Sequence, residues 1–159
     1  MADNFTTINA TGATETFAAD EVSGAKYPRL KVSLGADGTV RDMVGAATAY
    51  KLTSAATNNA TSVKASAGYL HSVNAGNINA AIRYLKLYNK ASAPAPATDN
   101  ALLLMVIPLP ASGGRVDIQF GDHPLYFDTG IGFAIVTDAS DTGNTSTAAN
   151  EQFVTLGYN

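Results

Sequence analysis

Short runs of alternating apolar and polar residues recur along the chain from about residue 46 onward. The clearest run is 81–89, which lacks Gly and Pro and is rich in β-branched, aromatic and leucine residues. This composition is typical of a strand, whose successive side chains point to opposite faces. One face is mainly apolar, and the other carries Tyr84, Lys86 and Tyr88. We therefore expect a central strand of a sandwich, or one whose second face contacts a neighbour.

The Tyr84, Lys86 and Tyr88 face is a candidate partner-binding surface. Tyrosine and lysine can bury their stems while their polar tips stay in water. An ordinary solvated outer face is the alternative interpretation, because exposed apolar atoms are normal on proteins.

The same pattern predicts eight further strands, separated by clusters of Gly, Pro, Asn, Asp and Ser. The expected ranges are 48–53, 61–65, 69–74, 102–108, 115–120, 125–127, 131–138 and 152–158. Many short strands at short spacing predict an all-β fold, an antiparallel β-sandwich or jelly roll. No run has the length and period of an amphipathic helix. The run 102–107 is apolar on both faces, so we expect it to be the innermost strand or to be covered by the N-terminal arm.

The N-terminal 20 residues have a different character. They are rich in Thr, Ala and Asn, show neither a helical nor a strand period, and contain isolated apolar residues at Phe5, Ile8 and Phe17. We expect an extended arm that is ordered only when it docks on something. The three apolar residues are candidate anchors for pockets on a partner, and a floppy leader is the alternative.

A β-hairpin is predicted after this arm. Two alternating runs, 27–34 and 39–44, flank Gly-Ala-Asp-Gly, and Asp-Gly between such runs is a strong hairpin signal. A lone hairpin is marginal in water, so it must pack on another surface. Tyr27, Arg29 and Lys31 are candidate contacts to a partner. The expected organisation is an arm and hairpin over residues 1–45 and a β-sandwich domain over residues 46–159.

Composition excludes some functions and favours others. Only 14% of the 159 residues are charged and the formal net charge is −3. This overall charge does not favour binding to nucleic acid, which needs a basic face. Cys is absent, which excludes disulfides and thiolate metal sites. Met1 is followed by neither the basic residues nor the apolar run of a signal peptide. The longest apolar run, 101–107, is far shorter than a membrane-spanning helix, which needs about 20 residues. We expect a soluble product made in the cytoplasm, with no membrane association.

Candidate chemistry is sparse. Ser112, Asp122 and His123 supply the residue types of a hydrolytic triad, but an adjacent Asp and His do not orient each other as a triad requires. Asp128, Asp138 and Asp141 could hold Ca²⁺, although their spacing matches no calcium loop and Asx turns explain them better. Exposed tyrosines could form a platform that stacks on sugars, against the simpler role of filling core and interfaces; the candidates are Tyr69, Tyr84, Tyr88, Tyr126 and Tyr158. We expect no cofactor, no metal and no enzymatic activity.

Three segments, 20–38, 52–68 and 83–94, resemble small virion proteins of tailed bacteriophages, of the capsid decoration (cement), head-fibre and tail-tip type. The resemblance implies a β-sandwich that forms a homotrimer, binds the major capsid protein on the capsid surface and bridges neighbouring capsid subunits. It also implies a structural role in the virion. The alternative is a tail-tip or fibre module that binds host glycan through the loops 91–100 and 138–149 and exposed tyrosines.

Overall fold

The computed structural model describes residues 5–8, 14–17, 19–22, 25–28 and 47–159. The chain divides into two compact units, Met1–Val44 and Gly45–Asn159. The larger unit is an antiparallel β-sandwich, which confirms the predicted all-β fold. Its nine strands match the nine expected ones within three residues at each end.

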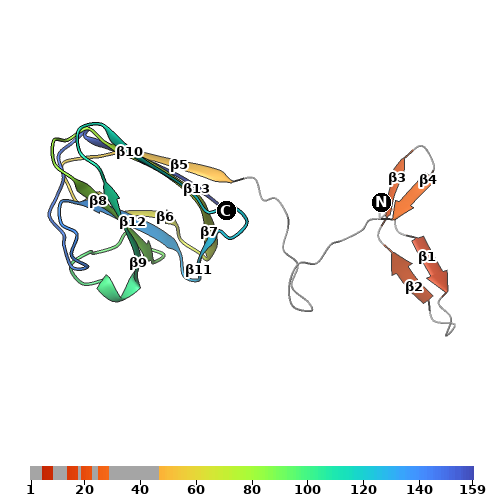
Figure 1. Ribbon diagram of the computed structural model, residues 1–159. Coiled ribbons are helices and arrows are strands. Elements are labelled where there is room, and N and C mark those ends of the chain that lie inside the picture. Colours follow the sequence, from red (N-terminus) through yellow and green to blue (C-terminus); the bar gives the residue numbers. More distant parts are fainter. Residues whose placement is uncertain (1–4, 9–13, 18, 23–24, 29–46) are drawn as a thin grey trace. The chain divides into compact units, whose positions relative to one another are not determined.

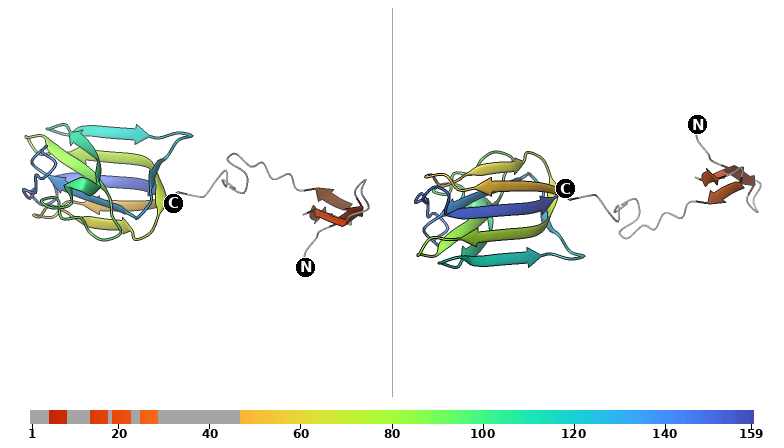
Figure 2. Two further views of the ribbon diagram at one scale, coloured as in Figure 1. Left: turned by 90° about the horizontal axis from the view of Figure 1, so that it is seen from below. Right: turned by 90° about the horizontal axis from the view of Figure 1, so that it is seen from above.

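One sheet of the sandwich has five strands. Its bounds are β5 (Thr48–Thr53), β7 (Gly68–Asn77), β10 (Gly114–Gln119), β11 (Leu125–Phe127) and β13 (Gln152–Tyr158). The strand order is β10-β7-β13-β5, and β11 also pairs with β7. Figure 2 shows β5, β13, β7 and β10 side by side.

The other sheet has four strands in the order β6-β12-β8-β9. Their bounds are β6 (Thr61–Lys64), β8 (Arg83–Asn89), β9 (Leu103–Leu109) and β12 (Ile131–Val136). A single 3₁₀ turn, η1 (Asn100–Leu102), leads into β9. In Figure 1 the two sheets form two layers of the larger unit. The strand β8 is central, as the two-faced pattern predicts, because β12 and β9 pair with its two sides.

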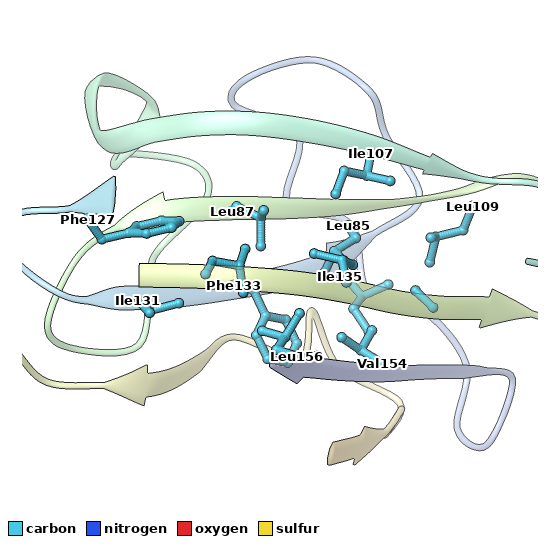
Figure 3. Close-up of a cluster of buried hydrophobic side chains, with 13 residues drawn as sticks. Leu85, Leu87, Ile107, Leu109, Phe127, Ile131, Phe133, Ile135, Val154 and Leu156 are labelled. Atoms are coloured by element: carbon cyan, nitrogen blue, oxygen red, sulfur yellow. The ribbon is translucent and has the colours of Figure 1, made fainter. Parts of the chain in front are cut away.

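The core lies between the sheets. Alternate residues of each strand point inward, and their apolar side chains meet in one cluster (Figure 3). The four-stranded sheet contributes Leu85 and Leu87 from β8 and Phe133 from β12, all with no exposed surface. Val154 and Leu156 of β13 face them from the five-stranded sheet. Burial of this apolar surface is the main favourable term for the fold.

The run 102–107 does not form the innermost strand. The strand β9 is an edge of the four-stranded sheet, with β8 as its described neighbour. Leu102 is 39% exposed and Leu104 is 47% exposed. The first alternative, an innermost strand, is wrong, because strand order depends on pairings between distant segments and not on local residue type. The second alternative, cover by the N-terminal arm, stays a prediction.

The described residues of the smaller unit form two short antiparallel hairpins. The first joins β1 (Phe5–Ile8) to β2 (Thr14–Phe17), and the second joins β3 (Ala19–Val22) to β4 (Ala25–Pro28). These pairings correct the expectation of an arm without strands. Each strand has only four residues, too few to show a period, although the Thr-rich composition suits strands.

The hairpin expected over 27–44 is only partly described. Tyr27 and Pro28 belong to β4, and Tyr27 pairs with Asp20 of β3 rather than with a downstream strand. The remainder of the predicted hairpin, including Arg29 and Lys31, lies outside the described residues. None of the described helical segments is long and apolar enough to cross a membrane.

Candidate partner-binding surfaces and the covered face of β8

The candidate anchors of the smaller unit lie on its strands. Phe5 and Phe17 are direct register partners across the β1–β2 hairpin, and Ile8 pairs with Thr14. The structure thus brings two of the three predicted anchors opposite each other in one hairpin.

The predicted surface on β8 is covered by the chain itself. Lys86 and Tyr88 have no exposed surface, and Tyr84 is half-buried. The prediction that these residues form a contact surface is therefore wrong for Lys86 and Tyr88. Two long loops cover this face, one over residues 90–99 and the other over residues 137–151.

The Lys86 ammonium group organises the second loop. Its Nζ donates hydrogen bonds to the backbone carbonyl of Ser140 and, at 2.9 Å, to that of Gly143. Burial lowers the pKa of Lys86, while the nearby carboxylates of Asp138 and Asp141 partly oppose this shift. A buried cation is tolerated only when hydrogen bonds and opposite charge replace its lost hydration, and this loop supplies both.

Tyr88 lies beneath the same cover. Its hydroxyl is buried and has no hydrogen-bond partner among the described residues. Burial raises the pKa of Tyr88 to about 12, and the negative charges of Asp99 and Asp141 add to the shift. Both effects disfavour the phenolate, because an anion would be poorly solvated there and close to other anions.

The first loop is fixed by a short polar network. Lys90 forms an ion pair with Asp99, which also accepts a hydrogen bond from the backbone N–H of Ala95 at 2.6 Å. That backbone bond and Lys90 lower the pKa of Asp99. Pro94 is buried and packs above Gly132 of β12, where an added Cβ would lie 3.3 Å from the proline Cδ. The loop therefore has a defined position over the sheet.

The residues considered for catalysis do not converge. Ser112 precedes β10 and His123 follows it, so the six-residue strand separates them by about 20 Å. No group of three or more His, Cys, Asp or Glu side chains suited to a metal ion occurs in the described part of the chain. Asp138 Oδ1 accepts a hydrogen bond from the backbone N–H of Ser140 at 2.9 Å, which is Asx-turn geometry. This bond lowers the pKa of Asp138.

The predicted tyrosine platform is reduced to one pair. Tyr69 and Tyr126 contact each other with ring centroids 4.9 Å apart and planes tilted by 41°. Tyr126 is 51% exposed. Tyr88 is buried, and Tyr158 packs against the core. An aromatic pair with one open ring offers a flat apolar surface for stacking.

Sequence reasoning missed the most exposed large apolar residues. Ile78 is 62% exposed and Ile82 is 42% exposed, in the loop between β7 and β8. Leu102 is the last residue of η1, and Leu104 is the second residue of β9. The lack of charged residues from Asn100 to Gly114 could have drawn attention to Leu102 and Leu104. The same apolar run, however, is equally typical of a buried strand.

Replacing Lys86 with Met tests the role of the ammonium group. The change keeps a long apolar stem but leaves the carbonyls of Ser140 and Gly143 without their donor, so we expect a loss of about 1–3 kcal/mol in the free energy of unfolding. Urea unfolding measures it, with Lys51→Met on exposed β5 as the matched control. A stability equal to that of the wild type would contradict this role.

Replacing Tyr88 with Phe tests the isolated hydroxyl. Because the pKa of Tyr88 in the folded protein is about 12 against an ordinary 10.0, its contribution to stability is fully present below pH 10 and is lost as the pH rises through 12. We expect Tyr88→Phe to be at least as stable as wild type at pH 7. Between pH 10 and 12 the free energy of unfolding of Tyr88→Phe should fall less than that of the wild type. The difference should be up to about 1.4 kcal/mol per pH unit. Urea unfolding across this range is the measurement, and parallel pH profiles would refute the assignment.

Comparison with known proteins supplies no relative. No protein-family model, no curated protein and no solved structure matches the chain.

Proposed function

We propose that the protein is a virion structural protein that binds the outside of a phage capsid and stabilises it by bridging neighbouring capsid subunits. In this proposal its partner is the major capsid protein, and the chain works as a homo-oligomer. The supporting observation is the division into a β-sandwich and a separate N-terminal unit whose described strands form two hairpins of four-residue strands. Two-stranded hairpins of this size are marginal in water, so they need a further surface.

The N-terminal unit is the proposed gripping element. Short strands can add to an exposed sheet edge on a partner, where main-chain hydrogen bonds give affinity and apolar side chains give specificity. Phe5, Ile8, Phe17 and Tyr27 are the proposed anchors. Attachment through several copies makes weak individual contacts sufficient. The bound protein would favour the assembled shell by mass action.

The low charge of the chain fits this role. With only 14% charged residues, against the usual quarter, much of its surface suits burial against other subunits. Charged residues are depleted in the cores of protein interfaces. No catalytic activity forms part of this proposal.

Deletion of residues 1–44 tests the function. We expect the truncated protein to keep a cooperative thermal unfolding transition, because the core lies in the larger unit. It should nevertheless fail to be incorporated into particles. The measurements are circular dichroism melting and quantitative gel analysis of purified virions assembled with either chain. Normal incorporation of the folded truncated protein would refute the proposal, and absence of the full chain from particles would refute any virion role.

A tail-tip or fibre module that binds host glycan is the second candidate. The observation that favours it is the Tyr69–Tyr126 pair, with its half-exposed outer ring. Sugars stack on such rings through their apolar faces.

A glycan array probed with the full chain tests this alternative. If a glycan stacks on Tyr126, Tyr126→Ala should lower binding at least tenfold while the fold is kept, since the side chain is exposed. Gln119→Ala, an exposed change on β10, is the matched control. Binding that is absent, or equal in both variants, removes the glycan candidate.

A further inference from the structure

The sheet edges of the sandwich differ in charge. The edge strands β5, β6 and β10 carry Lys51, Lys64 and the pair Arg115 and Asp117, respectively. Charged residues on an edge strand oppose unwanted pairing with other chains. The three-residue β11 is uncharged but short, and short edges are themselves protected.

The remaining edge strand is β9, which is longer than β11 and carries no charged side chain along its first five residues. It lies inside a run of 15 residues, Asn100–Gly114, without a charged side chain. Leu104 is 47% exposed, Leu102 before it is 39% exposed, and Val106 is partly exposed. Pro108 and Pro110 follow, and proline cannot donate to a strand ladder. The part of β9 able to pair on its open side is therefore Leu103–Ile107.

We propose that β9 pairs in antiparallel fashion with β9 of a second copy of this chain, which joins two four-stranded sheets into one. On a two-fold axis a strand lies opposite itself, so any charge on it would face its own copy. An uncharged apolar strand meets this condition, and each other edge of more than three residues does not. Homodimer interfaces are also more apolar than interfaces between separately stable proteins. This inference does not rest on the proposed function.

The pairing has a defined geometry. Two antiparallel strands place directly opposed Cβ atoms about 4.5–5.5 Å apart. Leu104 and Val106 of each copy would then cover those of the other. The β-bulge at Leu104, between the pairs Leu87–Met105 and Tyr88–Leu103, lies inside the paired segment, and Pro108 sets its C-terminal limit. A two-fold contact closes with two copies and leaves no further open edge of this kind.

Cysteine cross-linking tests the proposal directly, because the natural chain has no Cys. Single variants of the full chain, Leu104→Cys, Met105→Cys and Val106→Cys, are treated with a mild oxidant at micromolar concentration. A residue near the two-fold axis should give a disulfide-linked dimer on a non-reducing gel, since the opposed Cα atoms fall within disulfide range. Thr53→Cys on β5 and Gln119→Cys on β10 are the matched controls and should remain monomeric on the gel.

Sedimentation of the full chain supplies the second measurement. The wild type should contain an even number of copies, and Leu104→Lys should halve its mass while its circular dichroism spectrum stays unchanged. Gln119→Lys should keep the wild-type mass. A monomeric wild type, a trimer without cross-links at residues 104–106, or a Leu104→Lys variant of wild-type mass would each overturn the proposal. A monomer whose incorporation into particles is blocked by Leu104→Lys would assign β9 to a different protein partner.

Discussion

Two-sided burial of the β8–β12 pair is the constraint on which the sandwich depends. The inner face of this pair meets the five-stranded sheet through Leu85, Leu87 and Phe133. The outer face is covered by loops, and every residue of β12 is buried as a result. A strand buried on both faces must satisfy or neutralise every polar group that it carries. The positions of the loops follow from this requirement.

Lys86 shows how the requirement is met. Its charge lies under the 137–151 loop, and two backbone carbonyls of that loop accept its hydrogen bonds. Further bonds hold the same loop to the segment after β5: Asn58 Nδ2 donates to Asn144 Oδ1 at 2.7 Å, and Asn59 Nδ2 donates to Thr147 Oγ1 at 2.9 Å. The loop is thus fixed at several points along its length, and the bond between Asn59 and Thr147 pairs polar groups that are buried. Tyr88 is an exception, because its hydroxyl has no partner among the described residues, and Arg83 Nε of the same strand is a second.

The sequence predicted the strands well and the surfaces poorly. The period of side chains is a local property, so all nine strands of the sandwich are readable from runs such as 48–53 and 152–158. Whether a face is covered depends on segments far away in the chain. The face with Tyr84, Lys86 and Tyr88 has the composition of a solvent-exposed surface. The loops that cover it show no hydrophobic periodicity from which their position could be predicted. The apolar run correctly predicted that β9 is a strand. Its place at the edge of the sheet depends on pairings that no local pattern encodes.

The strands β8 and β9 differ in how far their apolar residues are covered. Both strands have apolar residues on both sides. Loops of the chain cover β8, whereas Leu104 of β9 is 47% exposed among the described residues. An exposed leucine is ordinary on any protein, but an open strand edge adds unpaired backbone groups to the apolar side chains. Water can satisfy those backbone groups, but it cannot offset the exposure of Leu102 and Leu104. A second strand paired along β9 would satisfy the backbone groups and remove the apolar side chains from water together.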